Sequence, residues 1–220
     1  MAVSEHPVSP LITLASGYGE PEMRSWCHAL FALDAQIASI VLTAREPMLA
    51  QIRLQWWRDV IGQDRAARPS ANPVLAALLP LEASGLDLRA ALDPVMQGWE
   101  AALDLDEPGA IDAFAQGRGH LMRGFQQLAP QASPDDLAHM GRCWALWDMA
   151  RCHRPSQATF DALLAIDIDA LAHIRLPRRL RPLSMIGRAV QLDIARGEMD
   201  RPWGRPGLFA ALVWHGLTGR

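Results

Sequence analysis

The sequence predicts an all-α fold, and three observations support this class. Apolar residues recur at steps of three and four along most of the chain, and no stretch alternates with a period of two for long enough to suggest a sheet. The run Ser133-Pro134-Asp135-Asp136 is a clear helix start, with a capping serine, a proline in the first turn and acids at the positive helix end. Half of the 220 residues are apolar, so the chain can bury a substantial core. We therefore expect a single-domain helical bundle over residues 1–220, with a flexible N-terminal segment over residues 1–20.

The apolar periodicity predicts about eight helices, separated by proline- and glycine-containing segments. The second of them is apolar on two faces and should be largely surrounded by protein. A later one contains Gly117 and Gly119, which either weaken it or let a neighbour approach closely. In chain order, the expected helical segments are 26–41, 48–61, 74–81, 89–103, 111–125, 133–152, 159–173, 184–196 and 207–217.

Composition excludes several functional classes. The formal net charge is −3, which gives no global attraction to nucleic acid, so no nucleic-acid partner is expected. All basic residues are arginines, so neither a Schiff-base lysine nor a P-loop lysine is available. The three cysteines show no paired spacing, which indicates a reducing compartment. With no secretory signal and no membrane span expected, the predicted location is the cytoplasm, with peripheral contact at the inner membrane face as a possibility that hydropathy leaves open.

Two segments resemble the squalene/phytoene synthase family. They are residues 29–38, ALFALDAQIA, and residues 46–59, EPMLAQIRLQWWRD. Residues 99–104 (WEAALD), 113–117 (AFAQG) and 140–151 (MGRCWALWDMAR) resemble the middle helices of the family. The resemblance is strong to Arg58, moderate to Arg151 and thin beyond, and the chain looks shortened after His153. It implies the isoprenoid-synthase fold, in which helices surround an apolar cavity, and a prenyl diphosphate transferase as the family activity.

The resemblance also shows what is missing. The family chemistry ionises prenyl diphosphates with Mg²⁺ held by two facing aspartate clusters. At the first cluster this chain keeps only Asp34, and at the second, directly after Arg151, no carboxylate remains. Glu100 and Asp104 share a helix face at i, i+4, but we interpret them as a solvated acidic face rather than a replacement. We therefore assign no catalytic residue, no metal site and no cofactor, with Mg²⁺ required only if the chain is an enzyme after all.

Several residues remain candidates for a ligand pocket. Arg53 and Arg58 could hold an anionic head group while Trp57 supplies apolar wall, although core packing of the tryptophan and pairing of the arginines with acids such as Glu46 or Glu100 are the preferred alternatives. The full candidate set is Asp34, Arg53, Trp57, Arg58, Glu100, Asp104, Asp148 and Arg151.

Two C-terminal features could contact a partner. One is the single cluster of basic residues in the sequence. It could bind a phosphate, a membrane surface or an acidic partner, but a solvated connector is the simpler interpretation. The other is a group of large apolar residues that should close the core, and that would indicate a protein interface if exposed. The basic cluster comprises Arg175, Arg178, Arg179 and Arg181. The apolar group comprises Trp203, Phe209, Leu212, Val213 and Trp214.

Two functional hypotheses follow. The preferred one is a non-catalytic synthase-like protein that acts through binding, as an assembly factor for a membrane (respiratory) complex or as a binder of an isoprenoid or other lipid. It rests on analogy with the catalytically degenerate branch of the family, which includes a mitochondrial assembly factor for respiratory complex I. The alternative is a prenyltransferase that condenses two prenyl diphosphates at a rearranged metal site around Asp34, Glu100, Asp104 and Asp148.

Overall fold

The computed structural model describes residues 8–153, 156–197 and 205–219, and all regular structure within these ranges is helical. The predicted all-α class is thereby confirmed. The α-helices are α1 (Pro10–Ser16), α2 (Pro21–Leu42), α3 (Pro47–Gly62), α4 (Pro73–Ala83), α5 (Leu88–Ala101), α6 (Ala110–Gly119), α7 (Leu121–Gly124), α8 (Pro134–Asp148), α9 (Gln157–Ala165), α10 (Arg181–Ala195) and α11 (Pro206–Thr218). Short helical turns of other types are η1 (Arg65–Ala67), η2 (Phe125–Leu128), η3 (Met149–His153), η4 (Asp169–Ala172) and η5 (Arg178–Leu180).

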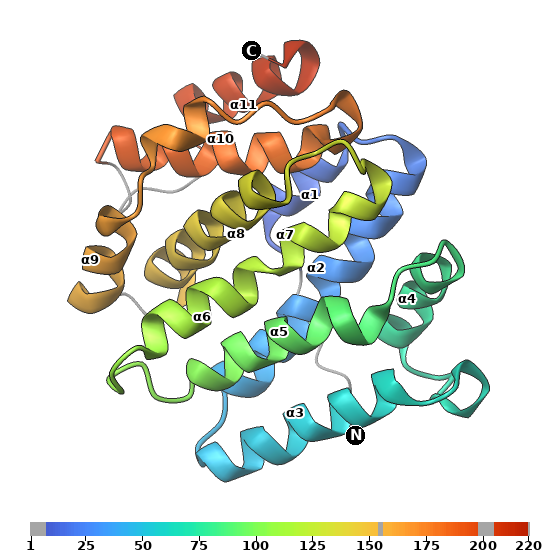
Figure 1. Cartoon of the computed structure of the whole chain (residues 1–220). Coiled ribbons are helices and arrows are strands. Elements are labelled where there is room, and N and C mark those ends of the chain that lie inside the picture. Colours follow the sequence, from blue (N-terminus) through green and yellow to red (C-terminus); the bar gives the residue numbers. More distant parts are fainter. Residues whose placement is uncertain (1–7, 154–155, 198–204, 220) are drawn as a thin grey trace.

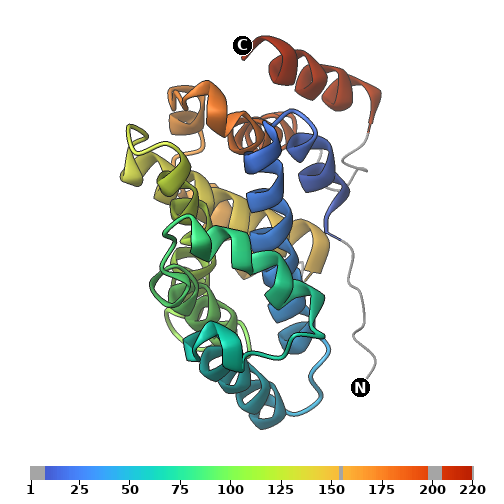
Figure 2. The ribbon, with the colours of Figure 1, turned by 90° about the vertical axis from the view of Figure 1, so that its right-hand side faces the viewer.

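The helices are arranged around α2. In Figure 1, α3, α5, α6, α8, α10 and α11 follow one another from the bottom of the view to the top, and the long α2 runs behind them. Helix α2 contacts α1, α3, α4 and α5, while α6 lies between α5 and α8. Figure 2 shows that α3 and α11 lie at opposite ends of the bundle. The buried apolar side chains form one continuous core cluster.

The helix boundaries follow the chemistry of the sequence. Proline occupies the first turn of α2, α3, α4 and α8, where its missing N–H is not needed for helical bonding. The predicted start at Ser133 is confirmed, because its hydroxyl accepts a hydrogen bond of 3.2 Å from the backbone N–H of Asp136. The predicted end near Cys152 is also close to the structure, where α8 ends at Asp148 and η3 continues to His153.

The prediction of a flexible segment over residues 1–20 is wrong for its second half. Residues 10–16 form α1, whose Leu11, Ile12 and Ala15 are fully buried. These side chains pack onto α2 and α10, so burial of an apolar face orders this segment. Residues 1–7 lie outside the described ranges.

Helix α2 is long and apolar enough to cross a membrane by length and composition alone. In the structure it is the central helix of the bundle, and neighbouring helices cover most of its side chains. It also carries the buried carboxylate of Asp34. Burial inside the protein therefore explains why the sequence of α2 is so apolar.

Helix α6 is held unusually close to both of its neighbours through glycines. A Cβ atom added at Gly117 would lie 2.6 Å from the Cα atom of Gly98 on α5. On the other side, a Cβ atom added at Gly141 of α8 would lie 2.0 Å from the carbonyl oxygen of Gly119. The backbones can approach this closely only because these positions lack side chains. The result is that Arg118, which lies between the two α6 glycines, is carried into the centre of the bundle.

Candidate functional site

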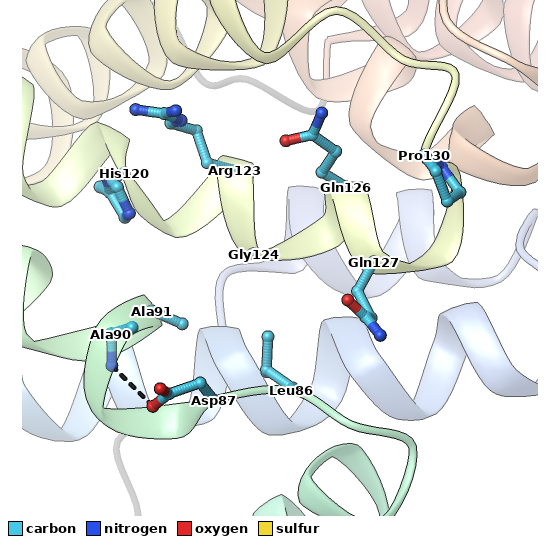
Figure 3. A pocket seen from close by; sticks show the side chains of 10 residues that line it. All are labelled: Leu86, Asp87, Ala90, Ala91, His120, Arg123, Gly124, Gln126, Gln127 and Pro130. Carbon is cyan, nitrogen blue, oxygen red and sulfur yellow. Dashed lines mark hydrogen bonds between the residues drawn. The ribbon is translucent and has the colours of Figure 1, made fainter.

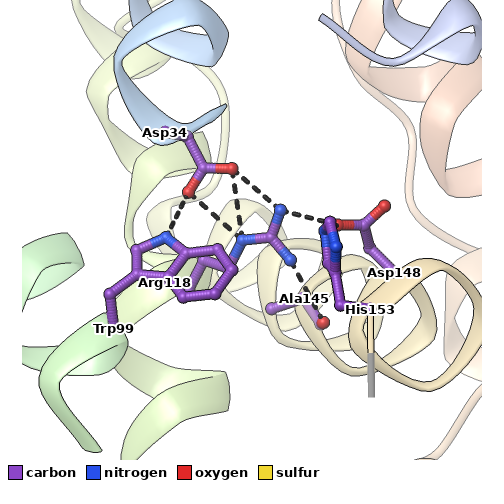
Figure 4. Close-up of polar contacts among 6 residues, drawn as sticks. All are labelled: Asp34, Trp99, Arg118, Ala145, Asp148 and His153. Carbon is purple, nitrogen blue, oxygen red and sulfur yellow. Dashed lines mark hydrogen bonds and ion pairs between the residues drawn. The ribbon is translucent and has the colours of Figure 1, made fainter. Parts of the chain in front are cut away.

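The centre of the bundle holds a buried arginine between two buried aspartates (Figure 4). Arg118 of α6 is 2% exposed, Asp34 of α2 is 3% exposed and Asp148 of α8 is 6% exposed. The Nη2 atom of Arg118 lies 2.8 Å from Oδ2 of Asp34 and 2.7 Å from Oδ2 of Asp148. Its Nε atom donates to both oxygens of Asp34 at 3.2 Å, and Nη1 donates to the carbonyl of Ala145 at 3.5 Å. One guanidinium thus bridges the two carboxylates.

Aromatic side chains enclose this ion triad. The guanidinium carbon of Arg118 lies 4.6 Å from the ring centroid of Trp99 and 4.2 Å from that of Trp144. Both distances allow cation–π attraction, which is strongest where water is excluded. The indole Nε1 of Trp99 also donates a hydrogen bond of 2.7 Å to Oδ1 of Asp34. Arg118 and Asp34 are therefore fixed by geometry as well as by charge.

The end of α8 brings a histidine to the triad. Residues 149–153 form the π-helical turn η3, which aligns residues five positions apart instead of four. The Nε2 atom of His153 consequently lies 3.0 Å from Oδ2 of Asp148. Neighbouring Cys152 is a thiol at neutral pH, because partial burial and the charge of Asp148 raise its pKa to about 12.

The charges of the triad support one another. Burial alone would raise the pKa of Asp148, but the positive charge of Arg118 and the hydrogen bond to His153 outweigh burial and hold this pKa well below its ordinary value. Burial alone would likewise lower the pKa of Arg118, but the charges of Asp34 and Asp148 outweigh it and raise that pKa further. Asp148 and Arg118 therefore stay ionised across the physiological pH range.

The lowered pKa of Asp148 makes the stability of the protein depend on pH. Between the unfolded pKa of about 3.8 and the lower folded pKa, the unfolded chain binds a proton that the folded chain does not. We expect this carboxylate to contribute its full stabilisation above about pH 5 and to lose it as pH falls, with a slope of at most about 1.4 kcal/mol per pH unit. Urea unfolding from pH 7 to pH 3 measures the slope. The Asp148→Asn protein should show a shallower slope, and equal slopes would contradict the assignment.

A second buried ion cluster lies on the far side of α8. Asp193 of α10 is fully buried, and its carboxylate accepts bonds of 2.7 Å from Arg151, 2.7 Å from Arg205 and 2.8 Å from the indole of Trp147. Arg151 belongs to the predicted pocket set, but this pairing holds its guanidinium to α10 and away from Asp34. The cluster joins α8, α10 and the start of α11.

A cavity of about 420 Å³ opens beside the ion triad. Asp34, Arg118, Asp148, Cys152 and His153 form its polar end. Its remaining wall is mostly apolar and comes from the segment before α1 together with α1, α2 and α8: Val8, Pro10, Ile12, Phe31, Ala35, Ala38, Leu42 and Trp144, with Ser9, Ser39 and Thr43 among them. A cavity of this size with a few convergent polar groups is typical of a small-molecule site.

The comparison with protein families bears directly on this cavity. Residues 8–108 match the squalene/phytoene synthase family. The match covers somewhat less than half of the chain and includes α1, α2, α3, α4 and α5, and hence Asp34. Arg118 and Asp148 lie beyond it. No curated protein and no solved structure matches the chain significantly. The all-α architecture is consistent with a fold of the isoprenoid-synthase type.

The squalene/phytoene synthase resemblance implies Mg²⁺ between facing carboxylates, and the residues present do not fit that ion. The aspartates Asp34 and Asp148 do face each other, but their inner oxygens are bound by Arg118 rather than directed at a common empty point. Within the described ranges, no three His, Cys, Asp or Glu side chains gather as potential metal ligands. A divalent cation would therefore have to displace a buried guanidinium of the same protein.

Of the candidate residues predicted from the sequence, Asp34 and Asp148 alone line the cavity. Arg58 pairs with Glu100 at 2.8 Å and with Asp93 at 3.2 Å, which is the acid pairing that we favoured for it. Asp104 is exposed and accepts a bond from the backbone N–H of Asp106. The rearranged metal site of Asp34, Glu100, Asp104 and Asp148 is therefore not assembled.

The site predicted on α3 for an anionic head group does not line the cavity either. Arg53 is exposed on the outer face of α3. Trp57 is buried in the core as expected and packs edge-on against Trp56, whose outer side is open. Neither arginine of this helix lines the cavity, so the positive charge at its polar end comes from Arg118 instead.

Arg118 is the residue that the sequence analysis missed. It stands in the polar run Gln116-Gly-Arg-Gly-His120, which resembles a solvated helix face. The available signal was the pair of flanking glycines, because glycine in a helix often marks a close backbone approach, and a residue between two such contacts must be buried.

Another cavity, of about 450 Å³, opens between the start of α5 and the segment formed by α7 and η2 (Figure 3). Its polar groups do not form a catalytic arrangement. Asp87 caps α5 by accepting a 3.0 Å bond from the N–H of Ala90. Partial burial and the charge of Arg123 lower the pKa of His120. We therefore regard the cavity beside Arg118 as the candidate site.

Proposed function

We propose that this chain is a non-catalytic squalene/phytoene synthase-like protein that binds an uncharged lipid in the cavity beside Arg118. One observation carries the proposal, namely that the guanidinium of Arg118 already occupies the space between the facing carboxylates of Asp34 and Asp148. The family chemistry would need metal ions between facing carboxylates. Arg118 neutralises the aspartates without offering open coordination positions. It thereby stabilises the scaffold at the place where diphosphate would have to be ionised.

The charge of the cavity supports an uncharged ligand. Two carboxylates face one guanidinium at its polar end, so Arg118 has no positive charge left over for an anionic ligand. A prenyl diphosphate would bring several more negative charges to this end without a metal to neutralise them, which costs free energy in a poorly solvated site. A prenyl alcohol or another neutral lipid avoids this repulsion and can still fill the apolar part.

The proposal predicts the outcome of a turnover assay. The purified protein, incubated with farnesyl or geranylgeranyl diphosphate and Mg²⁺, should release no diphosphate above the uncatalysed background. Robust Mg²⁺-dependent release that is lost in Asp34→Ala would contradict a non-catalytic role. Farnesol, in contrast, should raise the melting temperature, and Ala38→Phe should abolish this shift by filling the cavity without altering its charges.

A role as assembly factor for a membrane complex is compatible with the same site. A lipid-bound, non-catalytic helical bundle could present its outer helices to a protein partner, in the cytoplasm or at the inner membrane face. The exposed apolar residues of α3, Met48, Leu49, Ile52 and Trp56, favour such a contact because large exposed apolar patches often mark interaction surfaces. Co-purification from the native host would identify the partner.

A further inference from the structure

The end of the bundle formed by α10 and α11 holds a cavity that is lined by cationic side chains. It measures about 340 Å³ and lies between α10, the connection from η4 to η5, and the C-terminal end of α11. Arg175, Arg181, Arg188 and His215 line it, together with Ser184 and Gln191, and none of its lining residues is acidic. Two of these arginines belong to the basic cluster seen in the sequence, where a solvated connector was the simpler expectation.

The arginines of this basic cavity have neutral partners. Arg175 donates through Nη1 to the backbone carbonyls of Ala172 and Ile174, at 2.5 and 3.2 Å. Arg188 donates to the side-chain oxygen of Gln191 at 2.5 Å. The guanidinium of Arg181 packs against the backbone of Gly219. Within the described part of the chain, none of the three forms an ion pair with a carboxylate.

Several arginines elsewhere in the bundle are paired with carboxylates. Arg58, Arg68, Arg118, Arg151 and Arg205 each lie within 3.2 Å of a carboxylate oxygen, and Arg179 pairs with Glu22. The arginines of the basic cavity differ from these paired arginines, and they gather around one hollow. Guanidinium groups with open donors bind phosphate oxygens well, because their fork geometry allows two parallel bonds.

Helix α11, which borders the basic cavity, has an exposed apolar face. Phe209 is 44% exposed and Trp214 63%, so these two residues do not close the core as expected, whereas Leu212 is buried. Leu217 on the same helix is 70% exposed. Trp203 lies outside the described ranges. Helix α11 contains no Asp, Glu, Lys or Arg between residues 206 and 218. Figure 2 shows it as the outermost helix at this end of the molecule.

We propose that α11 docks onto an anionic phospholipid surface, with a phosphate-bearing head group in the basic cavity. An exposed apolar helix face beside uncompensated positive charge is the combination that binds reversibly at a lipid interface, where apolar side chains enter the acyl boundary and arginines meet phosphate. Tryptophan suits this depth because it has a large apolar ring and one polar N–H. The charge of the cavity argues for lipid, since an uncharged protein partner would leave the arginines desolvated and unpaired.

Vesicle co-sedimentation of the full chain tests the proposal. The protein should bind vesicles of phosphatidylcholine mixed with phosphatidylglycerol and bind pure phosphatidylcholine vesicles much more weakly. Arg181→Gln combined with Arg188→Gln should weaken binding by about fivefold per arginine, and Trp214→Ala should weaken it further. Circular dichroism shows whether each variant is folded, and Arg175→Gln, at an exposed side chain, provides the same test if the double variant does not fold.

The matched controls lie at the opposite end of the bundle. Arg53→Gln and Trp56→Ala change an exposed arginine and an exposed tryptophan of α3, and should leave vesicle binding unchanged. Loss of binding in these variants, or full retention in the α10 and α11 variants, would overturn the proposal. Calorimetric titration with inorganic phosphate distinguishes a lipid head group from free phosphate as the ligand of the basic cavity. Binding of free phosphate without binding of anionic vesicles would also overturn the proposal.

Discussion

Replacing Arg118 with alanine should lower the free energy of unfolding by about 3–5 kcal/mol, because removing one partner of a buried ion cluster leaves the others charged and unpaired. Asp34 and Asp148 are almost completely buried, and both depend on this guanidinium. The indoles of Trp99 and Trp144 would also lose the cation between them. Urea denaturation at neutral pH measures the change.

The matched control is Arg142→Ala. The Nη2 atom of Arg142 lies 2.8 Å from the carboxylate of Asp112, the same separation as between Arg118 and Asp34, but both side chains are substantially exposed. An exposed pair contributes about 0–1 kcal/mol, so this variant should unfold almost like the original protein. Equal effects of the two substitutions would show that the burial of Arg118 does not determine its contribution.

Replacing Gly141 with alanine should destabilise the bundle by about 3 kcal/mol. The new Cβ would lie 2.0 Å from the carbonyl oxygen of Gly119, which is backbone and cannot move aside without shifting α6. Such a shift would also displace Arg118 from the aspartates, so the loss should include part of the ion-triad stabilisation. Thermal and urea unfolding measure it.

Gly124→Ala is the control for this glycine effect. Gly124 is also helical, but the nearest atom to a Cβ at this position is a methyl carbon of Leu30 at 3.7 Å, an ordinary contact. Alanine should be neutral there or should stabilise by up to about 1 kcal/mol, because it has the higher helix propensity. If both alanine variants were equally stable, the close crossing of α6 and α8 would be refuted.

Much of the fold could be predicted because it depends on local signals. Apolar periodicity gave the helices, and the capping chemistry of Ser133 placed the start of α8 correctly. The N-terminal segment failed for the opposite reason. Residues 10–16 form only a short helix, and its order comes from contacts with α2 and α10. Helix α10 is distant in the sequence, so a local pattern cannot reveal this contact.

The candidate site was only partly predictable for the same physical reason. Asp34 and Asp148 were identified as candidates, and the structure brings them together. Glu100 and Arg58 were candidates too, but they pair with each other instead. The partner that connects the two aspartates, Arg118, comes from a third helix whose depth is set by glycine contacts between backbones, and spacing along the chain cannot reveal such a contact.

The most direct test of the account is a high-resolution crystal structure of the protein grown with Mg²⁺ and a non-hydrolysable farnesyl thiodiphosphate. We predict that Arg118 will still bridge Asp34 and Asp148, with no metal ion between the carboxylates and no diphosphate group bound to them. A magnesium ion coordinated by both aspartates, with the Arg118 guanidinium moved out of the triad, would contradict the non-catalytic role and support the alternative of a metal-dependent prenyltransferase.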